Sequence, residues 1–193
     1  AFRRIGHMYP KVKVPAEQGG GEVTVIAWIW ARTVKCPNPA CGHEAPLVRS
    51  FDLSKKKGKE YHVEALTNGG NLSFVVKPGK AKGDGTVNRT GAKCIHCGTP
   101  IDFPYIREEG KSHRMSERLM AVVAEGQAGR LYVSPSQTQV DFAAVPKPDD
   151  YPDAPIAKNP RDFKTPNYGL EYLSDLFTNR QLTMLVTFSD LVA

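Results

Sequence analysis

Four cysteines, the only ones in the chain, form two short pairs. Four residues separate Cys36 from Cys41 and two separate Cys94 from Cys97, and a glycine follows each pair. Four thiolates carried in two tight turns are typical of a closed, tetrahedral zinc site. A glycine after the second cysteine lets the backbone leave the turn with a positive φ. The spacing therefore predicts one structural zinc ion bound by Cys36, Cys41, Cys94 and Cys97.

Other uses of the cysteines stay open at this stage. A disulfide within either pair would close only a small loop and would add little stability. A redox role for Cys94 and Cys97 would suit a strand followed by a helix, as in thioredoxin, and the surrounding residues do not show this pattern. His43 or His96 could replace a cysteine as a ligand. His96 lies between two cysteines, so we expect it to be a solvated side chain.

Length and charge set broad limits on function. The chain has 193 residues, 40% of them hydrophobic, and a formal net charge of +6. This composition indicates one or two globular domains. No apolar run is long enough to cross a membrane, and we expect a cytoplasmic protein without a membrane partner. The positive charge favours an anionic partner such as DNA.

The basic residues gather between the two cysteine pairs. From Lys35 to Lys93 there are eleven Lys or Arg and five Asp or Glu, an excess equal to that of the whole chain. This insertion could follow a phosphate backbone, or its lysines could simply keep a loop soluble. Gly79 to Thr86 has the glycines and lysines of a phosphate-binding loop but not its spacing. The candidate DNA-contacting residues are Lys55, Lys56, Lys57, Lys59, Lys80 and Lys82.

Hydrophobic patterning predicts an α+β fold built on a zinc ribbon. Residues 23–35 are rich in β-branched and aromatic types at both parities, which indicates a strand buried on both faces. Residues 46–53 alternate and should return beside it. An inserted hairpin is predicted from residues 61–66 and 72–77, joined by the turn sequence of residues 68–71.

Mixed signals follow the second cysteine pair. Residues 98–107 begin as a strand that Pro104 interrupts. Residues 115–126 place Leu119 and neighbouring apolar residues on one broad face, which predicts a helix ending at Gly126. Residues 130–134 read as a short strand. The zinc-ribbon domain would then span residues 1–133, with a basic insertion at 54–93.

The last third of the chain is predicted to be a connector and two helices. Residues 134–166 contain prolines at 135, 146, 148, 152, 155, 160 and 166, which indicates an extended connector. Residues 167–193 form the helical segment. A short helix is expected at 170–177, and Thr178 with Gln181 matches a capping box for a second helix. That helix is apolar and has no C-terminal cap, so we expect it to be truncated and its face to be a docking surface.

Three stretches, at residues 28–42, 118–126 and 176–182, resemble zinc-ribbon-containing adenine-specific DNA methylases of bacteria and archaea. The resemblance covers nearly the whole chain. It implies that this segment lies inside a larger protein. In that family a glycine-rich loop for S-adenosylmethionine precedes the segment, and an Asp-Pro-Pro-Tyr catalytic motif follows it. The ribbon would be a structural part of the enzyme.

Neither motif occurs in this sequence. Asn38-Pro39-Ala40 lies inside the first cysteine pair, and Asn159-Pro160-Arg161 lacks the second proline and the aromatic residue. We therefore expect no catalytic and no S-adenosylmethionine-binding residue here, and that cofactor only in the parent protein. The segment would be an accessory region whose partners are DNA and the remainder of the methylase polypeptide. The alternative is a stand-alone zinc-ribbon module that binds nucleic acid or docks on a protein.

Overall fold

The computed structural model spans residues 1–193. It describes all of them except residues 127–128, 152, 158, 160, 162–163 and 193, and also leaves out the side chain of Glu17. The described chain has an α+β fold with mostly antiparallel sheets and few helices, as the sequence predicts. No helix in the described ranges is long and apolar enough to cross a membrane.

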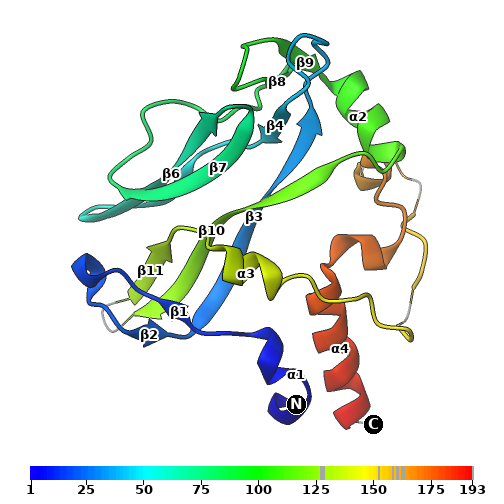
Figure 1. Ribbon diagram of the computed structural model, residues 1–193. Helices are drawn as coiled ribbons and strands as arrows, with labels where there is room; N and C mark the ends of the chain where they lie inside the picture. Colours follow the sequence, from blue (N-terminus) through cyan, green and yellow to red (C-terminus); the bar gives the residue numbers. More distant parts are fainter. Residues whose placement is uncertain (127–128, 152, 158, 160, 162–163, 193) are drawn as a thin grey trace.

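The central element is a four-stranded antiparallel sheet (Figure 1). Its strand order is β11 (Gly129–Val133), β10 (Ser116–Gly126), β3 (Val25–Lys35), β4 (Glu44–Leu47). The predicted strand at 130–134 is confirmed. The one predicted at 23–35 is confirmed from Val25 onward, whereas Val23 lies in β2 (Glu22–Val23) of another sheet. Its expected burial on both faces is wrong for the start of β3, where Ile26 is 50% exposed. Only the first part of the predicted return strand pairs with β3, because the chain leaves this sheet after β4.

β10 overturns the helix predicted at residues 115–126. It pairs with β3 on one edge and β11 on the other, and all of residues 119–124 are buried. A strand covered on both faces carries a continuous apolar run, which periodicity alone cannot separate from a buried helix. A register shift at Met120 adds to the ambiguity. Leu119 pairs with Trp30 and Ala121 with Ile29, so Met120 is an extra residue that turns Leu119 to the other face.

The insertion forms its own three-stranded sheet, made of β5 (Asp52–Lys56), β6 (Lys59–Asn68) and β7 (Asn71–Pro78). The predicted hairpin is confirmed as β6 and β7, and Asn68 pairs with Asn71 across a two-residue turn. Only the last two residues of the predicted return strand, Asp52 and Leu53, lie in β5. Thr86 fixes the break between β4 and β5: its Oγ1 accepts a hydrogen bond from the Val48 N–H at 2.9 Å and donates to the Pro46 carbonyl.

A second correction concerns the residues after the second cysteine pair. β8 (Gly91–Lys93) pairs with β9 (Pro100–Asp102), and α2 (Phe103–Lys111) follows at once. Pro104 therefore does not interrupt a strand, because it lies in the first turn of a helix. Asp102 caps that helix by accepting a hydrogen bond from the Tyr105 N–H at 2.8 Å.

Short elements make up both ends of the described chain. The N-terminal residues form α1 (Phe2–Ile5), η1 (Gly6–Met8), β1 (Val12–Lys13), η2 (Ala16–Gln18) and β2 (Glu22–Val23). The predicted connector is not extended throughout, because it contains α3 (Gln137–Asp141) and the start of η3 (Thr165–Tyr168). Its Pro152 and Pro160 lie outside the described residues.

The C-terminal helices agree with the prediction in part. The first is a 3-10 turn, η4 (Leu173–Leu176), and the second is α4 (Asn179–Val192). The predicted capping box is confirmed, since the Thr178 N–H donates to Gln181 Oε1 at 2.8 Å. The last residue of the predicted helix, Ala193, lies outside the described residues.

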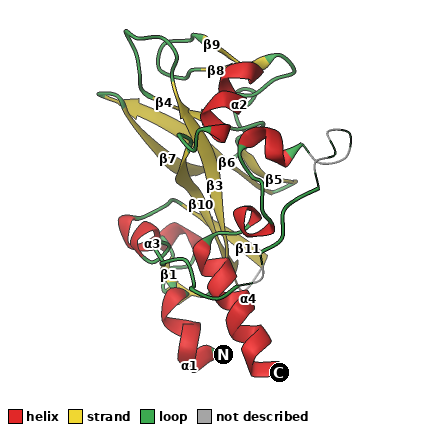
Figure 2. Ribbon diagram, turned by 90° about the vertical axis from the view of Figure 1, so that its right-hand side faces the viewer, coloured by secondary structure: helices red, strands yellow, loops and turns green. Residues whose placement is uncertain are grey.

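The two faces of β3 meet different partners (Figures 1 and 2). Ile29 and Ala31 pack with β6, β7 and β10 in one hydrophobic cluster, beneath the insertion sheet. Trp28 and Trp30 point to the opposite face, where they pack with Leu119 and residues of β1, β11 and α3. β3 ends at Lys35, so its C-terminal end leads directly into the first cysteine pair.

Candidate metal centre

The structure brings Cys36, Cys41, Cys94 and Cys97 together. Their sulfur atoms all lie within 4.8 Å of one another, and they are the residues that could hold a metal ion within the described part of the chain. Cys36 Sγ lies 3.6 Å from Cys97 Sγ, and Cys41 Sγ lies 3.9 Å from Cys94 Sγ. A tetrahedral zinc ion with Zn–S bonds of about 2.3 Å requires sulfur separations of about 3.8 Å. The residues present therefore fit zinc.

Disulfides do not describe this arrangement. The four cysteines are free. Both close contacts also join one cysteine of the first pair to one of the second, whereas the disulfide considered from the sequence would lie within a pair.

The first cysteine turn, residues 35–43, is built by backbone hydrogen bonds at the end of β3. The Cys36 N–H donates to the carbonyl of His43 at 2.9 Å, which closes the turn. The N–H groups of Cys41 and Gly42 both donate to the carbonyl of Asn38 at 2.9 Å. Gly42 has a φ of 59°, in the left-handed region that favours glycine. The positive φ inferred from the sequence is confirmed here.

The second cysteine turn, residues 93–99, repeats this construction between β8 and β9. The Cys94 N–H donates to the Thr99 carbonyl and the Gly98 N–H donates to the Cys94 carbonyl, both at 2.9 Å. Gly98 has a φ of 78°. Each turn thus presents its two sulfur atoms on the side that faces the other turn, although Cys41 and Cys94 are 53 positions apart in the sequence.

Asn38 joins the two turns through its side chain. Its Oδ1 accepts the Ala40 N–H at 3.0 Å, which rigidifies the first turn. Its Nδ2 donates across the gap to Thr99 Oγ1 at 3.3 Å and lies 3.9 Å from Cys97 Sγ. Sequence reasoning missed Asn38 and Thr99 because only the cysteines carry an obvious ligand signal. The one available clue was an asparagine within the first pair, where its side chain can cap a turn.

The environments of the thiols differ across the cluster. Burial raises the pKa of Cys36 to about 12. Hydrogen bonding by the Thr99 side chain, and then by its backbone, lowers the pKa of the exposed Cys97 to about 6. The Cys97 Sγ to Thr99 Oγ1 distance is 3.1 Å, and the hydroxyl can donate to the thiolate form. A metal ion must displace the protons of all four thiols, so binding should release protons.

Neither histidine joins the cluster. The ring of His96 contacts that of His43 in a tilted arrangement, with an interplanar angle of 41° and centroids 4.9 Å apart. His96 Nε2 lies 3.1 Å from the carbonyl oxygen of Glu44. His96 is half-buried, so the expectation of a solvated side chain is wrong. Its carbonyl contact instead ties the second cysteine turn to β4.

A small hydrophobic core supports the metal centre. Val34, Ala45, Ile101 and Ile106 are buried with Cys36 and Cys94 in one cluster. Ile101 is among the largest fully buried side chains of the described residues. α2 closes one side, where the Tyr105 hydroxyl donates to the Lys35 carbonyl at 3.0 Å. The sulfur atoms are therefore positioned by strands and a helix as well as by the two turns.

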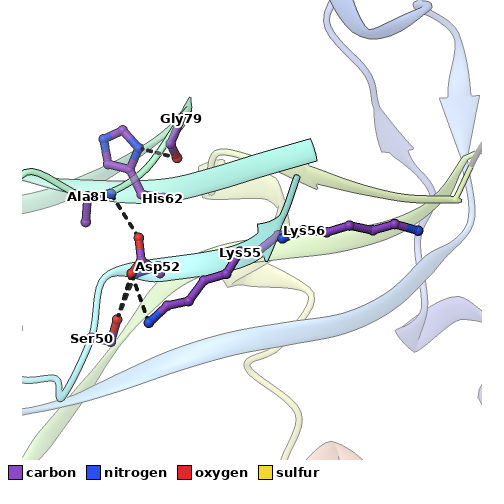
Figure 3. A network of polar contacts seen from close by, with 8 residues as sticks. Ser50, Asp52, Lys55, Lys56, His62, Gly79 and Ala81 are labelled. Atoms are coloured by element: carbon purple, nitrogen blue, oxygen red, sulfur yellow. Dashed lines mark hydrogen bonds and ion pairs between the residues drawn. The ribbon is translucent and has the colours of Figure 1, made fainter. Parts of the chain in front are cut away.

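Figure 3 shows the polar contacts that Asp52 makes with residues of the insertion, including Lys55. Asp52 accepts hydrogen bonds from the Ala81 N–H at 2.9 Å and from the Ser50 hydroxyl at 3.5 Å, and Lys55 Nζ lies 3.4 Å from it. The hydrogen bond from the Ala81 N–H is the largest cause that lowers the pKa of Asp52, and Lys55 lowers this pKa further. Lys55 points back to Asp52, whereas Lys56 points away along the strand.

The other predicted lysines are distributed over two places. Lys56 and Lys59 lie opposite each other across the β5–β6 turn, with Lys57 at its tip. Lys80 and Lys82 flank Ala81, whose N–H donates to Asp52. The structure thus places lysines at both the tip and the base of the β5–β6 hairpin. The side chains of all six predicted lysines are exposed: Lys55, Lys56, Lys57, Lys59, Lys80 and Lys82.

No family model, curated protein or solved structure matches this chain.

Proposed function

We propose that this chain is a structural zinc-ribbon region, non-catalytic by itself, that supports and positions a larger DNA-modifying protein. The observation that carries the zinc assignment is the convergence of four sulfur atoms from two turns at separations suited to tetrahedral coordination. Cys36, Cys41, Cys94 and Cys97 would fill all four positions around the ion. A closed site of this kind contributes to folding and leaves no position for a substrate.

Zinc would act here as a cross-link between distant segments. The first cysteine turn connects β3 to β4, and the second connects β8 to β9, with the whole insertion between them. Among the described residues, the contacts that already join the turns are the Asn38 side chain, the His43–His96 ring contact, the His96 contact with Glu44 and the small core beneath the sulfurs. Metal binding would therefore make a large share of the interaction between the two halves of the ribbon.

The resemblance to adenine-specific DNA methylases supplies the candidate parent protein. In this proposal the partner of the zinc region is the remainder of the methylase polypeptide, which would bring S-adenosylmethionine and the catalytic motif. Exposed apolar side chains in the C-terminal segment are suited to such an intramolecular contact. They include Leu176, Phe177, Leu185, Phe188 and Leu191, each 42–47% exposed.

Calorimetry with S-adenosylmethionine tests whether the cofactor site lies outside this chain, as the proposal requires. The chain should neither bind this cofactor measurably nor transfer a methyl group to DNA, because the motifs that would do so are absent from its sequence. A dissociation constant in the micromolar range would contradict the proposal. In the coding sequence that flanks this segment, a glycine-rich loop upstream and a Pro-Pro-Tyr motif downstream would favour the methylase over a stand-alone zinc module.

Contact with DNA is the second part of the proposal, and it is placed on the insertion. Binding should be sequence-tolerant and should weaken steeply with salt if the lysines neutralise phosphates. Replacing Lys55, Lys56, Lys57 and Lys59 together by glutamate should abolish it. A control in which the exposed Lys11 and Lys13 are replaced by glutamate should retain most of it. DNA affinity unchanged by the fourfold substitution would mean that these lysines only keep the insertion soluble.

A further inference from the structure

Two neighbouring cavities lie on the face of β3 opposite the insertion. One of about 530 Å³ lies between β3 and the start of α4, and one of about 460 Å³ lies between β3, α2 and η3. Trp30 and Arg32 line both. Each volume is in the range of small-molecule sites, and the shared walls make the two cavities neighbours. No local pattern in the sequence indicates this groove.

Arg180 is a buried cation at the edge of the first cavity. Its side chain is stacked on Trp28, with Cζ 3.6 Å from the ring centroid, and the residue is only 5% exposed. Its Nη1 donates to the Met8 carbonyl at 3.3 Å. No carboxylate of the described residues lies within ion-pair distance of it. A guanidinium has five N–H donors. Arg180 lines the first cavity and also a smaller neighbouring one, which it shares with Tyr9 and Trp28.

Other groups around the first cavity also favour an anion. Arg32 is exposed on β3, and the first turn of α4 opens into the same cavity. The N-terminus of a long helix attracts negative charge. Two carboxylates line the cavity too. Asp175 is held by the N–H groups of its own turn, from residues 171 and 172, and Glu117 pairs across the strands with Arg32. The cavity therefore joins two arginines, two carboxylates and the first turn of α4, which Thr178 and Gln181 cap in part.

The second cavity has a different character. Phe103, Tyr168 and Trp30 supply aromatic walls, and Arg49 supplies a further exposed cation. Aromatic side chains next to arginines are the combination that binds bases by stacking and their phosphates by charge. A ligand that spans the shared Trp30 and Arg32 needs a flat ring at one end and an anionic group at the other.

We propose that this groove binds a nucleotide, free or within a single strand, with its phosphate in the first cavity and its base in the second. The site lies on the face of β3 opposite the insertion, and it requires neither zinc nor the insertion lysines. It thus goes beyond the proposed function, and either can fail alone.

Titration of the tryptophan fluorescence of the full chain tests this site. The probes are adenosine 5′-monophosphate, adenosine, and a 5′-phosphorylated single-stranded DNA hexanucleotide. We expect the monophosphate to bind and adenosine to bind at least about tenfold more weakly, because it lacks the charge-assisted hydrogen bonds. A hexanucleotide that binds tighter than the monophosphate identifies a strand as the ligand, and equal affinity identifies a free nucleotide.

Substitutions locate the binding. Arg32→Ala should weaken binding of the monophosphate about tenfold or more, whereas Arg130→Ala, an exposed arginine on β11, should leave it unchanged. For the hexanucleotide, Arg32→Ala should also lower the salt slope by about one. Arg32 is exposed, so its loss should not unfold the chain. The fourfold Lys→Glu variant should still bind the monophosphate. No binding of either phosphorylated probe, or equal affinity in Arg32→Ala and the unmodified chain, would overturn the proposal.

Discussion

Asn38 should control how tightly the metal is held, although it is not a ligand. Asn38→Ala removes the acceptor for the Ala40 N–H at 3.0 Å and the donor that reaches Thr99 Oγ1 at 3.3 Å and Cys97 Sγ at 3.9 Å. Partners of this kind orient the ligands, and their loss typically lowers metal affinity by about 10- to 100-fold. That range corresponds to about 1.4–2.7 kcal/mol.

A second substitution separates the two roles of Asn38. Asn38→Asp keeps an oxygen that can accept the Ala40 N–H, but it places a negative charge beside the thiolate of Cys97. We therefore expect Asn38→Asp to lose at least as much zinc affinity as Asn38→Ala.

The assay is competition for zinc against a coloured chelator at pH 7, with circular dichroism to confirm folding. Asn71→Ala is the matched control, since Asn71 is an exposed asparagine at the far end of the insertion hairpin. Zinc affinities of both Asn38 variants within about twofold of the control would refute the reasoning, because the expected loss is at least about tenfold.

Three further predictions concern stability, each measured by urea unfolding. Ile101→Ala should cost about 2–5 kcal/mol, because Ile101 is 1% exposed beneath the sulfurs, and a cost below about 1 kcal/mol would contradict this. Gly110→Ala should cost about 1–3 kcal/mol, because its new Cβ would lie 2.5 Å from the Tyr168 carbonyl oxygen; an unchanged midpoint would be inconsistent with that contact. Asp52→Asn should be less stable than the parent chain at pH 7. The Ala81 N–H lowers the pKa of Asp52, so the carboxylate stabilises the fold above the unfolded pKa of about 4, and the difference should vanish as the pH falls through the lowered value.

The metal centre could be predicted because its signal is local. Each cysteine pair, with its glycine, is contained in a few residues, and the two turns have the backbone angles that those glycines allow. The β6–β7 hairpin and the start of α4 were predictable for the same reason. Their turn and capping residues act within four positions of one another.

β10 was mispredicted because tertiary packing, not local pattern, decides its structure. Both of its faces are covered, and the extra residue at Met120 shifts the parity of Leu119. α2 differs from β10, because the residues that start this helix are a local signal in the sequence. Asp102 and Pro104 form a helix start, although a proline after a strand-like run also predicts the end of a strand.

The groove along β3 could not have been predicted from the sequence. Arg32 and Arg180 are far apart in the chain, and they share a cavity only because α4 returns to the face of β3 that carries the tryptophans. Similarly, no local pattern shows that Asn38 of the first cysteine turn reaches Thr99 of the second. Such contacts depend on the register of strands that are distant in sequence.

The zinc content of the purified chain tests the central claim most directly. Protein prepared without added metal should contain about one zinc ion per chain by elemental analysis, and its four thiols should become reactive only after chelation. A variant in which Cys36 and Cys94 are both replaced by serine should lose the metal. Less than about a tenth of a zinc ion per chain, with all four thiols reactive from the start, would contradict the account.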